Sequence, residues 1–509
     1  MSSTANRVIK NTGYLYAKMG ITMFVSLYTT RLILNSLGTS DFGIFNIVGG
    51  AIAMLGFLNA AMASATQRFM SYSEGEGDKE KQKSIFNVSL ILHLGISLVV
   101  GIVLFIAGYF FFNGILNIPA DRIFAAKVVY GSLIVSTMFT VMTVPYDAAM
   151  NAHENMKYYA VVGILESFLK LAVAFACVYT TFDKLIVYGS LMACIPLITL
   201  TIMRIYCHKH YAECIIAPRI YWKKNLMKEM GAFAGWNFIG SFISVIGNYG
   251  MGIVLNHFFG TLLNAAQGIA NQISGQLGAL GSSMKKAINP IITKSAGAHA
   301  EELMIRSSIT GTKTTFFIVT ICFSPIMVDA RYILSLWLKN PPPYAYQFCL
   351  LLLITNIFQN LTLFIPQAIS AKGKIKKYTL WGTVIGIIPL ALSCICFSIG
   401  LPPYYMYFTM ILATLGRVAL DLYFGQKLCN INSWNFIKEV ILKLLLCLIF
   451  TFLIGYIIQF ILQPSFLRFI FIGFATVLTY TISFYWIGLD KEEKNLIKET
   501  YLSVKRRLL

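Results

Sequence analysis

The chain has 509 residues, of which 57% are hydrophobic and only 12% charged. Soluble globular proteins carry roughly 25% charged residues, so this composition excludes that class and indicates a polytopic membrane protein. The net charge of +20 would suit a nucleic-acid-binding protein, but the basic residues cluster in short loops between apolar runs. That pattern reflects membrane orientation and argues against nucleic acid as a partner.

Fourteen apolar runs are long enough to cross a bilayer as helices, since a span needs about 20 mostly apolar residues. A tight turn over 37–43 separates the first two, and amide side chains interrupt the eighth. The predicted spans lie near 12–37, 41–64, 84–112, 123–146, 157–181, 184–206, 230–256, 261–284, 306–333, 346–371, 377–399, 403–425, 437–460 and 465–488.

The connections between these spans alternate in charge. Most Lys and Arg residues fall in one set, and the positive-inside rule places that set, with both termini, in the cytoplasm. A missed span would invert the bias beyond it, so the alternation supports the span count. The basic set comprises 1–11, 65–83, 147–156, 207–229, 285–305, 372–376, 426–436 and 489–509.

A weak internal repeat indicates two halves. The segment LILN at 32–35 is echoed by IVLN at 253–256, and Gly38-Thr39 by Gly260-Thr261. The copies are six predicted helices apart and therefore share an orientation. We infer two six-helix lobes related by an axis along the membrane normal, an arrangement that typically encloses a central cavity opening alternately to each side.

The predicted division follows from this repeat. It gives an N-lobe over 1–206, a basic cytoplasmic linker over 207–229, a C-lobe over 230–425, two further spans within 426–488 and a cytoplasmic tail over 489–509. Apolar residues among Lys and Arg suit an amphipathic helix on the membrane surface for this tail, with a solvated tail as the alternative.

Amide side chains inside the spans are expected to avoid lipid, because an unsatisfied polar group there is costly. Asn264, Gln267 and Asn271 share one face of the eighth span by helical spacing. We predict that this face lines a wet cavity, with hydrogen bonding between helices as the alternative. Asn237 and Asn248 form a second polar group in the seventh span.

Two oppositely charged pairs are predicted within single helices. Glu166 and Lys170 stand four residues apart in the fifth span, with Glu166 roughly 15 Å deep at 1.5 Å per residue. Arg417 and Asp421 stand four apart in the twelfth span, nearer the cytoplasmic face. A pair one turn apart lowers the cost of burying each charge. We interpret the first pair as part of a substrate site and the second as a gate or structural pair.

Arg31 differs, because no Glu or Asp occurs in residues 1–40. Its counter-charge must come from another helix or from a ligand, and a guanidinium suits bidentate binding of phosphate. The alternative is that Arg31 reaches lipid headgroups at the outer end of its helix. Asp147 follows Pro145 at the cytoplasmic end of the fourth span. Because proline is expected to end or kink that helix, Asp147 is a gate or helix-end candidate.

Motifs of enzymes are absent from the sequence. It has no P-loop, no H-E-x-x-H and no nucleophile elbow, and no cytoplasmic loop long enough for a catalytic domain. The ten cysteines are scattered, without the spacing of metal ligands. We therefore expect a transporter with no cofactor, metal or disulfide.

The N-terminal hairpin resembles that of the Wzx-type lipid-linked oligosaccharide flippases in the multidrug/oligosaccharidyl-lipid/polysaccharide (MOP) exporter superfamily. The residues that carry the resemblance are Arg31, Leu37-Gly38, Asp41-Phe42-Gly43 and Gln67-Arg68-Phe69. The resemblance implies translocation of an undecaprenyl-pyrophosphate-linked glycan from the cytoplasmic to the periplasmic leaflet of a bacterial inner membrane. It implies the lipid-linked oligosaccharide as substrate, and glycan polymerase or glycosyltransferases as candidate partners.

The resemblance also implies roles for individual residues. Arg31 and Lys170 become candidate contacts of the pyrophosphate, whereas Asn264, Gln267 and Asn271 become candidate contacts of the glycan. Three alternatives stay open. A multidrug exporter coupled to H+ or Na+ needs central carboxylates in the N-lobe, where only Glu166 qualifies. A lipid II flippase would present several cavity arginines, and a membrane glycosyltransferase or polymerase would need a large extramembrane loop.

Overall fold

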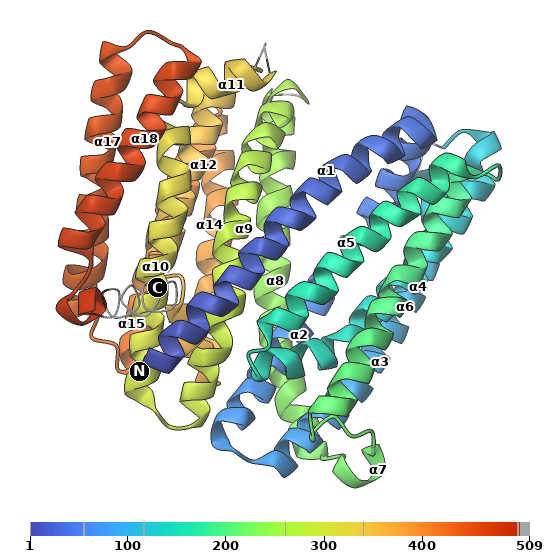
Figure 1. Cartoon of the computed structure of the whole chain (residues 1–509). Helices are drawn as coiled ribbons and strands as arrows, with labels where there is room; N and C mark the ends of the chain where they lie inside the picture. The colour runs from blue at the N-terminus through green and yellow to red at the C-terminus, as the bar shows by residue number, and fades with distance from the viewer. Residues whose placement is uncertain are drawn as a thin grey trace, which may run out of the picture. The chain divides into compact units, whose positions relative to one another are not determined.

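The structure is a computed structural model that describes residues 2–53, 56–115, 118–259, 261–338, 341–495 and 498. Every regular element in these ranges is helical (Figure 1), which confirms the all-α prediction. The elements are α1 (Ser2–Ala53), α2 (Gly56–Glu76), α3 (Lys79–Phe110), η1 (Phe111–Ile115), η2 (Ala120–Arg122), α4 (Ile123–Ala152), α5 (Met156–Tyr179), α6 (Lys184–His210), α7 (Pro218–Tyr221), α8 (Lys224–Phe259), α9 (Thr261–Gly297), α10 (Glu301–Val328), α11 (Ala330–Leu338), α12 (Ala345–Asn360), α13 (Ile365–Ala371), α14 (Lys376–Ser398), α15 (Tyr405–Cys429), α16 (Ser433–Phe436), η3 (Ile437–Leu442), α17 (Lys443–Ile461), α18 (Phe466–Ser483) and η4 (Phe484–Gly488).

The predicted spans fall on these helices. Within the described ranges, nine helical segments are long and apolar enough to cross a membrane, or ten when α12 and α13, which meet at a bend of 45°, count as one span. The other predicted spans coincide with α1, α2, α8 and α9. Amides and small residues make α9 less apolar than its neighbours, yet it is a continuous helix from Thr261 to Gly297.

The break between the first two predicted spans lies at Gly38. This residue has φ 76° and ψ 170° inside α1, a backbone region that is essentially restricted to glycine. The turn predicted over 37–43 is therefore confirmed as a sharp interruption of the helix. The echo of this segment, 253–256 with 260–261, spans the end of α8 and the start of α9, and its residue 260 lies outside the described residues.

The chain forms two compact units. The N-terminal unit comprises Lys10–Ser241 with Gly297–His299, and the C-terminal unit comprises Met1–Ile9, Phe242–Ala296 and Ala300–Leu509. The predicted lobe boundaries around 207–229 stay a prediction.

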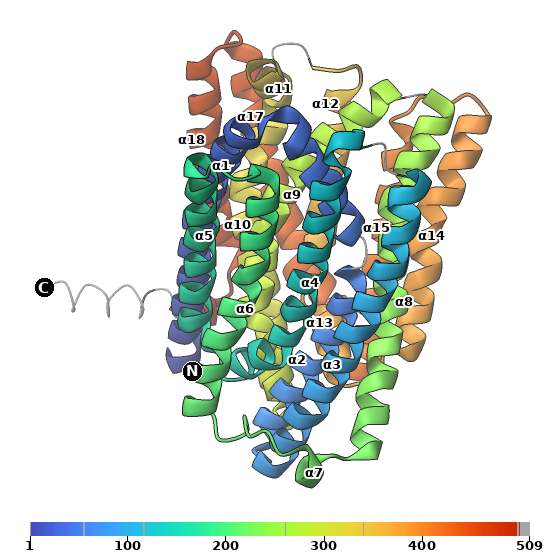
Figure 2. The same cartoon turned by 90° about the vertical axis from the view of Figure 1, so that its right-hand side faces the viewer.

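In the N-terminal unit, α4 packs between α3 and α6 (Figure 2). Val100 of α3, Val129 of α4 and Leu185 of α6 are buried together in one apolar cluster. Helix α1 runs along α5: Ser36 donates a hydrogen bond to the carbonyl of Cys177 (3.0 Å), and the rings of Tyr28 and Phe175 are 6.4 Å apart. These contacts fix which face of α1 meets α5.

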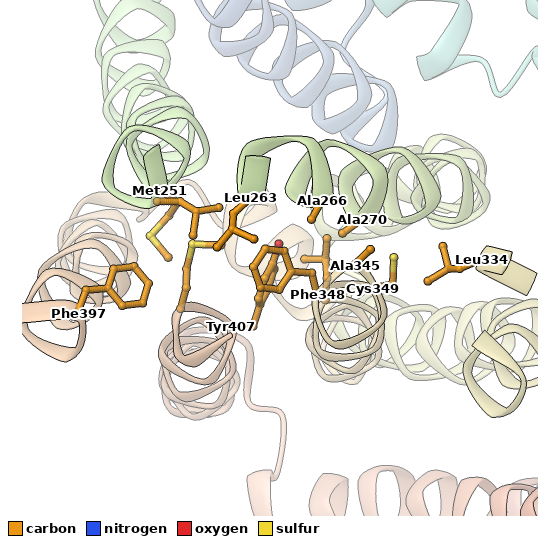
Figure 3. Close-up of a cluster of buried hydrophobic side chains, with 13 residues drawn as sticks. Met251, Leu263, Ala266, Ala270, Leu334, Ala345, Phe348, Cys349, Phe397 and Tyr407 are labelled. Atoms are coloured by element: carbon orange, nitrogen blue, oxygen red, sulfur yellow. The ribbon is translucent and has the colours of Figure 1, made fainter. Parts of the chain in front are cut away.

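The C-terminal unit has its own apolar core, which joins six helices (Figure 3). Phe348 of α12 meets Tyr407 of α15 with ring centroids 4.9 Å apart, and Met251 of α8 and Leu263 of α9 pack in the same cluster. Helices α17 and α18 pair with each other and pack on α10. The core thus holds the α8–α9 hairpin, which bears the predicted amide face, against α12 and α15.

Pro145 is expected to end or kink its helix, and of these two outcomes the helix end is wrong. Pro145 lies inside α4, which continues to Ala152, so Asp147 is not at a helix terminus. A proline removes one backbone hydrogen bond, and the neighbouring bonds carry the helix past it. Beyond Pro145, the side chain of Asn151 also donates to the carbonyl of Asp147 (2.8 Å).

The start of the predicted tail is tied to α10. Lys313 is 3% exposed, and its Nζ lies 2.8 Å from Glu493 Oε2 and 3.6 Å from Asp490 Oδ2. A buried ammonium needs such a partner, because an unpaired charge in a low-dielectric interior is costly. Most of the predicted amphipathic segment, 496–497 and 499–509, lies outside the described residues.

Candidate functional site

A charged strip on α1 and α5 contains one of the predicted pairs. Tyr159, Gly163, Glu166 and Lys170 recur at the spacing of one helical face on α5. Lys170 Nζ lies 2.7 Å from Glu166 Oε1, as predicted, and both side chains are about two-fifths exposed. Lys18 of α1 lies over the ring of Tyr159 (4.2 Å) and against Gly163, where a Cβ would collide with it. We call these five residues the α1–α5 strip.

The strip carries a net positive charge. Glu166 compensates Lys170, whereas Lys18 makes no ion pair with any carboxylate in the described part of the chain. Sequence reasoning missed Lys18, although the signal was present: residues 1–40 lack any acidic residue, which applies to Lys18 as much as to Arg31. An ammonium without a carboxylate partner can pair with the anionic group of a ligand.

At the opposite end of α1 and α5, Arg122 joins two carboxylates. Its Nε donates to Asp41 Oδ1 (2.9 Å), and its terminal nitrogen donates to Asp183 Oδ2 (2.7 Å). Asp41 follows the break at Gly38, and Asp183 caps the first turn of α6 by accepting from the amides of Leu185 and Ile186. We call Arg122, Asp41 and Asp183 the Arg122 triad.

Charge pairing dominates this triad. Burial alone would raise the pKa of Asp183, but the Arg122 guanidinium and the α6 amides lower it below its usual value. Both carboxylates are therefore engaged by a cation within the protein. The ion pairs of Arg122 connect the segment after Gly38, which holds Asp41, with the starts of α4 and α6. The triad escaped prediction because its members are 81 and 61 residues apart.

The second predicted pair lies in a buried network of the C-terminal unit. Asp421 is 3% exposed and accepts hydrogen bonds from Tyr378 (2.8 Å) and Thr362 (2.8 Å). Arg417 Nε is 3.4 Å from the same carboxylate, and its NH2 donates to the Tyr378 hydroxyl (2.5 Å). Gly382 leaves space for the guanidinium, because a Cβ there would collide with it. We call these residues the Asp421 network; it joins α14, α15 and the α12–α13 turn.

The predicted amide residues are dispersed. Gln267 is half-buried, with Oε1 3.2 Å from the position of a Cβ on Gly252, and Asn271 is exposed. Asn237 is half-buried in the N-terminal unit, and its Nδ2 has no hydrogen-bond partner among the described residues. The side chains of Arg31, Asn248 and Asn264 lie outside the described part of the structure.

Further along the face predicted from Asn264, Gln267 and Asn271, one polar residue bonds another helix. Ser274 of α9 accepts a hydrogen bond from Asn356 of α12 (2.7 Å). This contact is an instance of hydrogen bonding between helices, the alternative weighed for that face. Asn271 on this face is exposed. The interpretation that the face lines a wet cavity stays a prediction.

His153 lies in a cluster of polar and aromatic side chains in the N-terminal unit. His153, which follows α4, donates from Nε2 to Glu213 Oε1 (2.5 Å) and stacks on Tyr211 at 4.2 Å. Its Nδ1 lies 3.6 Å from Glu74 Oε1. Burial raises the pKa of Glu213, but the hydrogen bond and charge of His153 outweigh it and leave that pKa below its ordinary value of 4.5.

This lowered pKa predicts a pH-dependent stability. A carboxyl whose pKa is depressed by folding stabilises the fold above its unfolded pKa, and the contribution is lost as the pH falls through the folded value. Glu213→Gln is therefore expected to lower the melting temperature at pH 7, with the difference from wild type narrowing below about pH 4.5. Thermal unfolding of the purified proteins at pH 7 and pH 4 measures this. A difference of equal size at both pH values would contradict it.

Comparisons with known proteins agree with this architecture. Residues 17–176 match the family model MatE, and no curated protein matches the sequence. Solved structures with a similar fold include a MATE protein in the bent conformation, at TM-score 0.73 and 13% identity over 85% of this chain and 97% of that chain. An outward-facing multidrug resistance MATE family transporter of the MOP superfamily has TM-score 0.71 and 14% identity over 84% and 96%.

A third similar structure is a MOP superfamily transporter from Pyrococcus furiosus, with TM-score 0.70 and 13% identity over 84% of this chain and 96% of that chain. It is described as having a binding pocket whose reverse polarity suggests a different function.

Members of the MATE/MOP superfamily are transporters and not enzymes. The findings support the predicted superfamily, and they suit the multidrug-exporter alternative at least as well as the flippase. The chain has the fold of the MATE transporters of the MOP superfamily, and its residues 17–176 match the MatE family.

Proposed function

We propose that this MOP-type transporter moves an anionic amphiphile, an undecaprenyl-pyrophosphate-linked oligosaccharide, from the cytoplasmic to the periplasmic leaflet of a bacterial inner membrane. The oligosaccharide would be a repeat unit of O-antigen, capsule or exopolysaccharide. The observation that carries the proposal is the surplus positive charge of the α1–α5 strip, where Lys18 has no carboxylate partner among the described residues. A pyrophosphate-sugar headgroup cannot enter hydrocarbon, and a polar basic path lowers that barrier.

The pairing of the carboxylates supports the same proposal. A cation-coupled exporter needs carboxylates that are free to bind H+ or Na+. Here Asp41 and Asp183 bind one guanidinium, and Glu166 binds an ammonium. Each internal cation must be displaced before an external one can bind. This arrangement favours an anionic substrate over a cationic drug.

Alternating access supplies the mechanism. The two lobes would rock about the substrate site, so that the headgroup meets cations first from the cytoplasmic side and then leaves to the periplasmic side. Lys18 and Lys170 would contact the pyrophosphate, joined by Arg31 and by the amides of α9 for the sugars. The polyprenyl chain stays in lipid throughout, and coupling to H+ or Na+ is not required by this scheme.

A cation-coupled multidrug exporter is the second candidate. The match of residues 17–176 to MatE and the likeness to a multidrug resistance MATE transporter favour it. The Pyrococcus furiosus transporter is described as having a binding pocket of reverse polarity that suggests a different function.

Reconstitution separates the two candidates. Purified protein in liposomes is expected to translocate a fluorescent undecaprenyl-pyrophosphate oligosaccharide and to leave the cationic dye ethidium in place. In cells, Arg31→Ala is expected to abolish surface glycan at a normal protein level. Gradient-driven ethidium transport without lipid translocation would establish the second candidate instead, and unchanged glycan display would remove the role of Arg31.

A further inference from the structure

We propose that the C-terminal unit carries a separate site for the phosphate headgroup of a lipid. A cavity of about 700 Å³ lies between α11 and the end of the α17–α18 pair, lined among others by Asp329, Arg331 and Arg468. Figure 1 shows α11 and the α17–α18 turn at one end of this unit, which the charge bias of the loops predicts to be the periplasmic end. The inference is independent of the transported substrate, because none of these residues belongs to the α1–α5 strip.

The floor of the cavity is a rigid ion pair. Arg468 donates from Nε to Asp329 Oδ2 (3.1 Å) and from NH2 to Oδ1 (2.5 Å). Its remaining NH1 donates to the carbonyl of Leu462 (3.3 Å). Asp329 is fully buried, and Arg468 is 6% exposed. A bidentate pair of this kind fixes both side chains, so the cavity is preformed.

Arg331 gives the cavity its charge. Asp329 offsets Arg468, and the lining contains no other carboxylate. Arg331 is exposed, lies 4.7 Å over the ring of Tyr346 and makes no ion pair with any carboxylate among the described residues. The lining therefore has a net charge of +1. A guanidinium with free donors matches the oxygens of a phosphate, which it binds bidentately.

The surroundings favour a lipid over a free phosphate. Phe460, at the rim, is 93% exposed, and Phe466 and Leu467 beyond the turn are also exposed. Apolar side chains at the end of a membrane-spanning hairpin face acyl chains. Tyr332 and Tyr456 line the same cavity, and such amphipathic rings suit the level of lipid headgroups. A ligand with a phosphate next to hydrocarbon fits both surfaces at once.

Binding of a short-chain lipid tests the site. Full-length protein in detergent is titrated with dioctanoyl phosphatidic acid, and affinity is measured by isothermal calorimetry. Arg331→Ala is expected to weaken binding about tenfold or more, as for the loss of a charge-assisted hydrogen bond. Arg331→Lys is expected to retain most of the affinity. Ser335→Phe places a ring in the cavity without removing a charge and is also expected to weaken binding.

Two controls define the outcome. Lys438 lies over Trp434 at 5.1 Å elsewhere in the unit, so Lys438→Ala removes a comparable cation and is expected to leave the affinity unchanged. Dioctanoyl phosphatidylcholine is expected to bind more weakly than phosphatidic acid. Wild-type affinity in both Arg331→Ala and Ser335→Phe would overturn the site. Binding of inorganic pyrophosphate as tightly as phosphatidic acid would overturn the lipid assignment and give the site to a free phosphate.

Discussion

Asp421→Ala is expected to destabilise the protein by about 3 kcal/mol, because it leaves the Arg417 guanidinium without its carboxylate. This is the lower end of the range for breaking a buried pair, since the Arg417 side chain is 39% exposed. Tyr378 and Thr362 also lose their acceptor, which adds the cost of unsatisfied hydroxyls. Thermal unfolding of the purified variants in detergent measures the loss.

A surface pair with the same spacing provides the control. Lys443 and Glu439 also form an i,i+4 pair, but the Glu439 side chain is 62% exposed. Glu439→Ala is expected to change stability by no more than about 0.5 kcal/mol. Asp421→Asn keeps an acceptor oxygen and is expected to fall between the two. Equal stability of Asp421→Ala and Glu439→Ala would show that the Asp421 network contributes nothing to folding.

Lys18→Ala is expected to reduce export of the lipid-linked glycan about tenfold or more. The ammonium supplies the uncompensated charge of the α1–α5 strip, and one charge-assisted hydrogen bond to the headgroup is worth about 1.5–3 kcal/mol. Lys18→Glu reverses the charge and is expected to abolish export. Initial rates in proteoliposomes, normalised to reconstituted protein, give the measurement.

Matched variants distinguish charge from structure. Lys18→Arg keeps the charge and is expected to retain most of the rate. Lys157, an exposed cation in the first turn of α5, lies outside the strip, and Lys157→Ala is expected to behave as wild type. Full export by Lys18→Glu at a normal melting temperature would remove the strip from the substrate path.

Local features of this fold could be predicted, whereas contacts between distant segments could not. The break at Gly38 follows from the turn residues around it, and the Glu166–Lys170 pair follows from spacing on one helix. Tyr378 joins Asp421 from 43 residues away, and no pattern in the sequence marks that contact. Pro145 lies inside α4, because tertiary packing can carry a helix past a proline that would end it in isolation.

The candidate site shows the same division. The sequence shows which predicted spans contain charged residues. Only the fold shows which of these charges pair with an opposite charge. Arg122 binds Asp41 and Asp183, which lie in separate segments of the chain. Lys18 carries no local pattern that marks it, and α5 places an aromatic ring and a glycine against it.

The ion pair between Lys313 and Glu493 has a consequence for biosynthesis. The two residues are 180 positions apart, so α10 is made long before its buried lysine can be neutralised. At about 5–20 residues per second, the ribosome needs roughly 10–40 s to reach Glu493. During that interval the ammonium must stay hydrated or bind another anion, and α10 cannot take its final place. Assembly of the C-terminal unit is thereby deferred until translation is almost complete.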